Sequence, residues 1–393
     1  MNTFSFTLLY LFLEAIELNF LDLVLKKLLS LSEVLKSQPK NIIGVDISSA
    51  AIKLLEVEAS SDGFNITAYG VEALPEGVIF DREIVDVKKI AEVLASVYKK
   101  SGARSRNVAV AVSGSSVISS YIDLPSNLTA NQMEARVQLE AETIIPFPLE
   151  NVHLDFAVVG ESPINNDQLR IQVVACQRDY VDRRKEVVQL AGLDPIVVDV
   201  ETFAFARAYE TLINSEFKTP KKQQGLIRKD DVVAIADIGA TQFTFLVLSN
   251  QTIIYSVEQP IGGRQLTEEI QRHYNLTWAE AGRAKRKGGL DDDYTKSMLQ
   301  PFKDLLVENL SRCIQIFYSS TETNKIDKLV LSGGVSQTEG LVDQIADSVG
   351  IPTDIIDLSK NVSISIPINR SRLESDIPSV MLAFGLALTR ESP

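Results

Sequence analysis

The chain has 393 residues, and a usual domain size of about 150 residues predicts two to three domains. Hydrophobic residues make up 45% and charged residues 23%, which excludes a disordered or fibrous chain. The formal net charge of −13 disfavours binding to nucleic acid, or to anionic lipid, through a basic surface.

Cysteine and histidine are too scarce to build several kinds of site. With two residues of each type, the chain lacks the material for a disulfide framework, a zinc site or a histidine-based catalytic triad. Lone cysteines such as Cys176 and Cys313 favour a reducing compartment.

Residues 1–40 are predicted to be an amphipathic N-terminal extension. The uncharged run from Met1 to Leu13 is shorter than the about 20 apolar residues of a membrane-spanning helix, so no transmembrane span is predicted. From Phe20 onward, leucines recur at helical spacing, with two lysines off that face. Three interpretations stay open: a helix docked on the body, a helix in a membrane interface, and sequence upstream of the natural start.

Apolar patterns predict the elements of the first half of the body. A hairpin over 41–59 and a strand over 64–73 precede a helix over 86–100 and a strand over 107–114. Then come the strand VISSYIDLP, a helix over 130–143 with Asn131 as its cap, the proline-stiffened IIPFPLENV, and the strands HLDFAVVG and LRIQVVACQ. The last elements are a helix over 180–191, the strand DPIVVDVE, a helix opening at TFAFARAYE and a linker over 218–231.

The second half begins as the body begins. Residues 231–259 are predicted to form a strand, a small-residue turn, a strand, a turn and a strand. IIGVDISSAAIKLLEV matches VAIADIGATQFTFLVL, which indicates an internal duplication. The remaining predicted elements are helices over 266–274, 278–287 and 298–320, the loop GGLDDD, a strand–glycine turn–helix unit over 328–350 and a buried helix at SVMLAFGLAL.

The two duplicated turns suggest a phosphate-binding chemistry. Asp46 ends the first strand and Asp237 ends its counterpart, and small residues follow each aspartate. The backbone N–H groups of such a turn can converge on a phosphate. Each aspartate can hold Mg²⁺ through water. A third element, LSGGVSQTEG, places glycines between a strand and a helix, where a flat ligand can lie close to the backbone.

These three elements, in this order, resemble the two phosphate motifs and the adenosine motif of the actin, hexokinase and heat-shock ATPase superfamily. The closer resemblance is to the PilM family of actin-like type IV pilus assembly proteins, and it covers nearly all of residues 41–390. It rests on GVDISSAAIKLLEV, EAETIIPFPLENVHLDF, VVDVETFAFARA, IADIGATQFTFLVL, PIGGRQLTEEI, LVLSGGVSQTEGL and AFGLAL.

The resemblance implies an α/β fold: the actin-like (ribonuclease H-like) duplicated two-lobe ATPase fold with an inserted α+β subdomain of the FtsA and PilM type. It places the first lobe (1A) at 41–120 and 196–220, and the inserted subdomain (1C) at 120–195. The second lobe (2A and 2B) is expected at 231–393, with 2B near 264–325.

The resemblance also implies the ligand-binding residues. Asp46 and Asp237 are expected to hold Mg²⁺ through water. Ser48 stands where the family usually has glycine, and Gly282 where an acid is common; both departures leave ATP binding expected and weaken the case for hydrolysis. The implied ATP-binding residues are Asp46, Ser48, Ser49, Ala50 and Lys53 in the first turn, Asp237, Gly239, Ala240 and Thr241 in the second, Gly262 and Gly263 in the cleft, and Lys285, Gly333, Gly334 and Val335 around the adenosine.

Two glutamates near the predicted connection between the lobes are weak catalytic candidates. Glu140 and Glu142 are placed to position a water molecule, although acids on a polar helix more often form a solvated face.

The function implied by the resemblance is that of a cytoplasmic, ATP-binding scaffold of type IV pilus assembly, which serves pilus biogenesis and twitching motility and is at most a slow ATPase. Its implied partner is the cytoplasmic N-terminal peptide of a PilN-like protein, bound in a groove beside the inserted subdomain. That partner would hold the scaffold at the inner membrane, and nucleotide would switch its affinity. Other inner-membrane and motor components and self-association are further expectations; nucleic acid is not.

Two alternatives stay open. An FtsA-like cell-division protein would share the fold, but such proteins carry a C-terminal amphipathic helix, and this sequence ends at TRESP without one. A small-molecule kinase of the same superfamily would need a catalytic aspartate in a substrate loop, and residues 120–195 offer no such motif.

Overall fold

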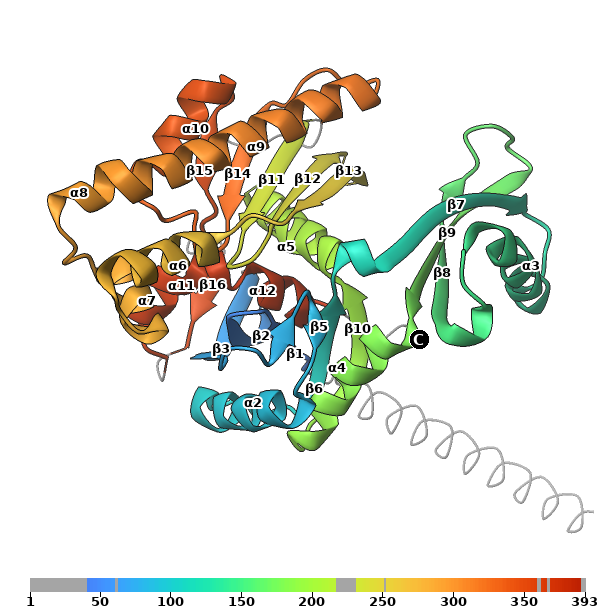
Figure 1. Cartoon of the computed structure of the whole chain (residues 1–393). Coiled ribbons are helices and arrows are strands. Elements are labelled where there is room, and N and C mark those ends of the chain that lie inside the picture. Colours follow the sequence, from blue (N-terminus) through green and yellow to red (C-terminus); the bar gives the residue numbers. More distant parts are fainter. Residues whose placement is uncertain are drawn as a thin grey trace, which may run out of the picture. The chain divides into compact units, whose positions relative to one another are not determined.

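The computed structural model describes residues 41–60, 63–216, 231–250, 252–358, 362–365 and 368–389 (Figure 1). All the described helices and strands belong to the unit Ile42–Pro393. The predicted extension over 1–40 and nearly all of the predicted linker over 218–231 lie outside the described residues. The lobe boundaries stay predictions.

Six strands form the first sheet, and its strand β1 (Ile43–Ile47) leads into the first predicted phosphate turn. β1 pairs antiparallel with β2 (Ala51–Ser60), as the predicted hairpin requires, and parallel with β6 (Asn107–Val112). Four of its five residues are buried, which suits an apolar strand with packing on both faces. The order is β10–β6–β1–β2–β3–β16, with β10 at Asp194–Val200, β3 at Gly63–Ala73 and β16 at Val362–Ile364.

The second sheet repeats this topology over five strands. β11 (Val233–Ile238) pairs antiparallel with β12 (Phe243–Ser249) and parallel with β14 (Lys328–Ser332), just as β1 pairs with β2 and β6. This repetition agrees with the predicted duplication. The order is β13–β12–β11–β14–β15, with β13 at Thr252–Gln259 and β15 at Thr353–Ile355.

Helices cover the two sheets, and one hydrophobic cluster contains residues of both sheets. Residues of α2 (Val87–Ser101) and α4 (Arg178–Leu190) pack on one side of the first sheet. α5 (Glu201–Glu216) and α12 (Met381–Ala387) contribute to a cluster that includes residues of both sheets. The other side of the second sheet packs against residues of α6 (Gly263–Tyr274), α7 (Trp278–Lys287), α9 (Gln300–Ser320) and α10 (Leu341–Val349).

A third sheet has its own small core. β7 (Val117–Pro125) and β8 (Val152–Glu161) flank β9 (Gln168–Gln177), and all pairs are antiparallel. α3 (Ala130–Ile144) packs on this sheet through Val137 and Ala141 (Figure 1). Short 3₁₀ turns precede β7 and β8, at Gly114–Ser116 (η1) and Leu149–Asn151 (η2).

The cap predicted for α3 is wrong. Thr129, not Asn131, precedes the helix, and its hydroxyl accepts a hydrogen bond from the backbone N–H of Gln132. The Gln132 side chain accepts the Thr129 N–H in return, at 3.0 Å, which completes a capping box. This reciprocal pair satisfies two free N–H donors at once, so the helix begins directly after Thr129. Asn131 therefore lies inside the helix.

Several short elements escaped prediction. The hairpin of β4 (Ile79–Phe80) and β5 (Glu83–Ile84) turns at Asp81 and Arg82, which both have positive φ, of 45° and 70°. This turn was not predicted, because hairpin turns of this kind usually have glycine at the second position, where this one has Arg82. The other short elements are α11 at Arg370–Asp376 and a 3₁₀ turn at Ile377–Ser379 (η4).

The acidic run predicted as a loop instead begins a helix. The Asp291 side chain accepts a hydrogen bond from the N–H of Tyr294 at 3.2 Å and another from the hydroxyl of Tyr274 at 2.7 Å. α8 (Asp292–Tyr294) and a π-helical turn, η3 (Thr295–Leu299), then lead into α9. An acid at a helix start is favourable because it satisfies free N–H groups there.

α12 packs by direct backbone contact. A Cβ atom on Gly44 would lie 1.9 Å from the carbonyl oxygen of Ala383, and one on Gly385 would lie 1.9 Å from that of Ala204. Both positions therefore require glycine, because the backbones approach closely. Gly44 allows the contact of β1 with α12, and Gly385 allows the contact of α12 with α5. Every residue of α12 is buried.

We expect opposite stability changes from the same substitution at two helical glycines. Gly385→Ala should destabilise the protein by about 2 kcal/mol, because the new methyl group overpacks against backbone. Gly282→Ala in α7 should stabilise it by about 0.5 kcal/mol, because its Cβ would lie 3.7 Å from the nearest atom and the unfolded chain loses freedom. Urea denaturation measures both, and a shift of the same sign for the two variants would contradict this packing.

Candidate functional site

The first predicted phosphate turn begins at a buried ion pair. Asp46 is 4% exposed and faces Lys53 across the hairpin, where the two residues are paired in register. The lysine Nζ lies 2.9 Å from Asp46 Oδ2. A buried carboxylate needs such a partner, because desolvation of an unpaired charge is costly. The two residues predicted to act together are therefore in contact.

The Ser48 side chain is hydrogen-bonded within the hairpin turn to which it belongs. Its backbone N–H and its hydroxyl both donate to the carbonyl oxygen of Ala51, at 3.1 and 2.9 Å. The side chain that stands where the family usually has glycine is thus tied to the hairpin. The carbonyl of Ala50 accepts the N–H of Leu74, which fixes the other side of the turn at 2.9 Å.

The two phosphate turns meet. The hydroxyls of Ser49 and Thr241 are 2.9 Å apart and share a hydrogen bond, although 192 residues separate them in the sequence. One residue follows β1 and the other follows β11, so the ends of corresponding strands in the two sheets face each other. The structure therefore brings together two turns that were predicted separately, as a single site requires.

The second turn packs on the paired glycines. The N–H of Gly239 closes the turn onto Gln242 at 2.9 Å, and its carbonyl accepts the N–H of Gly263 at 3.0 Å. A Cβ on Gly262 would lie 2.5 Å from the carbonyl oxygen of Ala240. Close backbone approach thus explains why glycine occupies this position.

The third glycine element meets the same strand end. Gly333 has φ of +84°, and its Cβ would lie 2.3 Å from the carbonyl oxygen of Ile238, so both space and conformation favour glycine. The N–H of Val335 donates to that carbonyl at 3.2 Å. Gly334, by contrast, is exposed, and no atom lies within 4 Å of its Cβ position. It leaves open space beside the turn.

Lys285 lies between these glycine elements. Its Nζ donates to the carbonyl of Gly263 at 2.7 Å and to the hydroxyl of Thr267 at 2.6 Å. Burial, followed by repulsion from Arg286, lowers its pKa to about 8. The Cβ position of Gly263 is 2.8 Å from Val335 Cγ2 and 3.2 Å from Lys285 Nζ, so these residues adjoin.

The aspartate at the end of β11 lacks full charge compensation. Burial raises the pKa of Asp237 to about 6, and the charge of Asp46 adds to the rise. The charge of Lys53 and the neighbouring Ser332 act in the opposite direction. Two carboxylates that share one lysine fit a Mg²⁺ site, because this ion commonly takes one or two carboxylates along with water and phosphate oxygens.

A third acid at this site was missed by the sequence analysis. Glu201 begins α5 directly after β10, and burial raises its pKa to about 8. Asp46 raises that pKa further, while Arg184 lowers it. The signal was present, because DPIVVDVE is an apolar strand that ends in an acid, like the strands of Asp46 and Asp237.

The two glutamates predicted as weak catalytic candidates lie elsewhere. Glu140 and Glu142 are both on α3, which packs on the third sheet (Figure 1). Glu140 lies 3.7 Å from Arg136 in a surface pair one helical turn away, and Glu142 is exposed. The structure brings neither together with the phosphate turns, so a solvated helix face accounts for both.

Glu201→Gln should stabilise the ligand-free protein in a pH-dependent manner. An acid whose pKa rises from 4.5 to about 8 on folding costs stability above pH 4.5, and this cost grows until about pH 8. The neutral amide avoids the cost, so the variant's gain in melting temperature should be small near pH 5 and largest near pH 8. Thermal unfolding at both pH values measures it, with the exposed Glu268→Gln as control. An equal gain at both would contradict the burial of Glu201.

Two comparisons with known proteins match most of the chain. A family model described as "Type IV pilus assembly protein PilM" matches residues 44–391. The chain is also similar to a solved "PilM-PilN type IV pilus biogenesis complex", with 26% identity, a TM-score of 0.74, and coverage of 90% of this chain and 100% of that one.

Two other solved structures are more distant. The ethanolamine utilization protein EutJ from Carboxydothermus hydrogenoformans has 15% identity and a TM-score of 0.48, over 88% of each chain. MreB 5 of Spiroplasma citri bound to AMPPNP has 11% identity and a TM-score of 0.44, over 88% of this chain and 94% of that one.

The predicted actin-like α/β fold is confirmed. In the part of the chain that the structure describes, no helix has both the length and the apolar character to cross a membrane.

Proposed function

The chain belongs to the PilM family of type IV pilus assembly proteins, and we propose that it is an ATP-binding assembly protein that recruits a PilN-like membrane protein. The observation that carries the nucleotide part is the 2.9 Å contact between Ser49 and Thr241, because it joins two phosphate-type turns from corresponding strands. The match to the solved complex supports the partner.

In the proposed ATP site, turn N–H groups and Lys53 would bind the phosphates. Asp46 and Asp237 would hold Mg²⁺, which neutralises phosphate charge when bound. Gly262 and Gly263 would line the cleft beside the second turn. The adenosine would lie against Gly334, with Lys285 and Val335 nearby, because Gly334 borders open space while its neighbours are packed.

Any hydrolysis is proposed to be slow. Glu201 is better placed than Glu140 or Glu142 to orient a water, since it shares its electrostatic surroundings with Asp46 and Asp237. A general base must be ionised to accept a proton. With a pKa of about 8 in the ligand-free protein, Glu201 is largely protonated at neutral pH. Because Glu201 can accept few protons before a ligand binds, we propose a nucleotide-dependent scaffold with slow turnover.

The proposed partner is the cytoplasmic N-terminal peptide of a PilN-like protein, bound beside the third sheet. There a small cluster of Val112, Cys176, Val181 and Val200 joins β9 of that sheet to α4 and the first sheet. The partner would keep this protein at the cytoplasmic face of the inner membrane. Other pilus components and self-association remain part of the proposal. The family match favours this function over the FtsA-like and kinase alternatives.

Calorimetry tests both parts of the proposal. We expect Mg-ATP to bind, a synthetic N-terminal peptide of the cognate PilN-like protein to bind, and the nucleotide to change the peptide affinity by about fivefold or more. A scrambled peptide is the control. Absence of peptide binding at high concentration, with and without nucleotide, would refute the partner; absence of Mg-ATP binding would refute the nucleotide site.

A further inference from the structure

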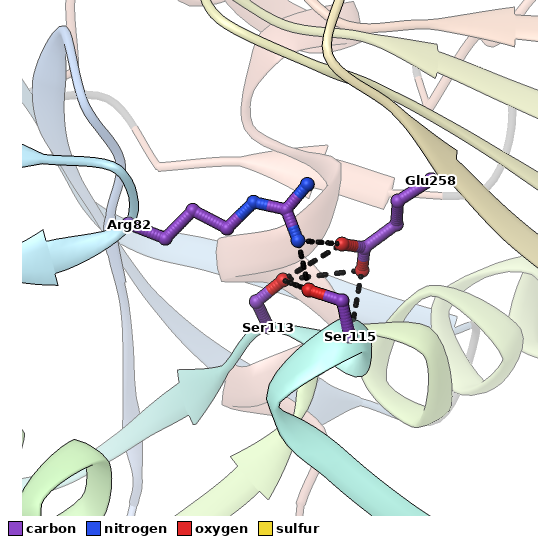
Figure 2. A network of polar contacts seen from close by, with 4 residues as sticks. All are labelled: Arg82, Ser113, Ser115 and Glu258. Carbon is purple, nitrogen blue, oxygen red and sulfur yellow. Dashed lines mark hydrogen bonds and ion pairs between the residues drawn. The ribbon is translucent and has the colours of Figure 1, made fainter.

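The carboxylate of Glu258, in the second sheet, is held by residues that directly follow strand β6 and by the turn of the β4–β5 hairpin. Glu258, on β13, is surrounded by the hydroxyl of Ser113, the backbone N–H of Ser115 and the guanidinium of Arg82, as Figure 2 shows. Ser113 Oγ lies 3.1 and 3.0 Å from its two oxygens, Ser115 N lies 3.2 Å from Oε1, and Arg82 Nη1 lies 2.5 Å from Oε2. We call these four residues the Glu258 cluster.

The cluster is tightly built. The Glu258 side chain is 6% exposed, and Arg82 also donates to the Ser115 hydroxyl. A Cβ on Gly114 would lie 3.0 Å from Glu258 Oε1, so the carboxylate approaches the turn at its residue without a side chain. A buried carboxylate with several donors fixes geometry strongly, because losing them leaves a desolvated charge.

The cluster lies where the third sheet joins the first. Ser113 follows β6, and Ser115 lies in η1, which leads directly into β7 of the third sheet. Arg82 comes from the turn between β4 and β5. Glu258, which belongs to the second sheet, therefore holds the segment that leads into the first strand of the third sheet, β7.

The same carboxylate is in register with the second phosphate turn. Asp237 pairs with Thr244, and Thr244 pairs with Glu258, so these residues form one row across β11, β12 and β13. Directly paired residues point to the same face of a sheet. Two strand spacings place the ends of this row about 10 Å apart. A movement of β11 at the phosphate turn would therefore be carried to Glu258 within one hydrogen-bonded sheet.

We propose that the Glu258 cluster transmits nucleotide binding at the phosphate turns to the third sheet, and so regulates the surface offered to the partner peptide. The inference rests on the proposed ATP site. Phosphate between the two turns would displace the direct bond between Ser49 and Thr241 and shift the sheets relative to each other. The cluster converts that shift into a movement of η1 and β7. Glu258 is thus a positioning residue, which acts through the segment that it holds.

Hydrogen–deuterium exchange of the full chain tests the proposal, with Mg-ATPγS as the probe and peptides covering residues 113–125. In the wild type, nucleotide should change the exchange rate of this segment by about fivefold or more. Glu258→Gln should bind the nucleotide with nearly unchanged affinity by calorimetry, but the segment should no longer respond. Arg82→Gln, at an exposed turn, should likewise bind the nucleotide without a response in this segment. It tests the role of the cluster if Glu258→Gln does not fold. Glu268→Gln, an exposed glutamate of the same lobe, should respond like the wild type.

The alternative outcomes are distinct. A normal nucleotide response in both Glu258→Gln and Arg82→Gln would overturn the role of the cluster. A wild type that binds nucleotide without any change over residues 113–125 would overturn it as well, and would leave the ATP site intact. A wild type that binds no nucleotide would instead refute the proposed function, and the inference with it.

Discussion

Asp237→Asn should weaken Mg-ATP binding by about 100-fold, which corresponds to about 2.7 kcal/mol. The substitution removes one of two carboxylates proposed to hold Mg²⁺ and leaves the size of the side chain unchanged. Affinity for ADP in the presence of a chelator should change much less, because no metal is then involved. Calorimetric titration with each nucleotide separates the two effects.

Folding should survive this change. Burial already raises the pKa of Asp237 to about 6, so the native state disfavours the charge that asparagine lacks. Thermal unfolding of the ligand-free variant at neutral pH should therefore show no loss of stability. Asp347→Asn, on the exposed side of α10, which packs on the same sheet, is the matched control. Wild-type affinity for Mg-ATP in Asp237→Asn would exclude the end of β11 from the metal site.

Gly334→Val should weaken the binding of both Mg-ATP and metal-free ADP by about 10- to 100-fold, the effect of roughly 1–3 kcal/mol of steric conflict. The new side chain would occupy the open space where the adenosine is proposed to lie. Stability should stay within about 0.5 kcal/mol of the wild type, because Gly334 is exposed and its Cβ position is free of neighbours.

Gly333, next to Gly334, is expected to respond differently to substitution. Gly333→Ala should lose stability, since its Cβ would lie 2.3 Å from the Ile238 carbonyl oxygen and its φ is +84°. Denaturation and nucleotide titration of the two variants thus distinguish a packing glycine from a ligand-facing one. Unchanged ADP affinity in Gly334→Val would move the adenosine away from this turn.

Local patterns in the sequence predicted the framework well, because the duplicated unit repeats a strand, an acid and a small-residue turn. Asp46 and Asp237 were found this way, and the structure places their turns in contact. Glu201 follows the same rule at the end of β10, but it begins a helix instead of a hairpin. The pattern of acid and hairpin therefore does not single out Glu201, and the two acids predicted to position a water, Glu140 and Glu142, lie on α3 instead.

Other features were beyond sequence reasoning for physical reasons. The β4–β5 turn has positive φ at both Asp81 and Arg82, and arginine stands where such a turn prefers glycine, so composition gave no signal. The pairing of Arg82 with Glu258 joins residues 176 positions apart and depends on how the two sheets meet. Ser49 and Thr241 each stood in a recognisable turn, but only the fold shows that their hydroxyls touch.

The position of α12 in the sequence has a consequence for biosynthesis. β16 pairs with β3 and completes the sheet that begins at residue 43, and α12 then packs on that sheet by touching β1 at Gly44. Contacts of such long sequence separation form slowly, because loop closure must precede them. While the ribosome still holds residues 362–387, the apolar face that α12 covers stays open. Binding to chaperones should therefore persist until residues 362–387 have left the ribosome.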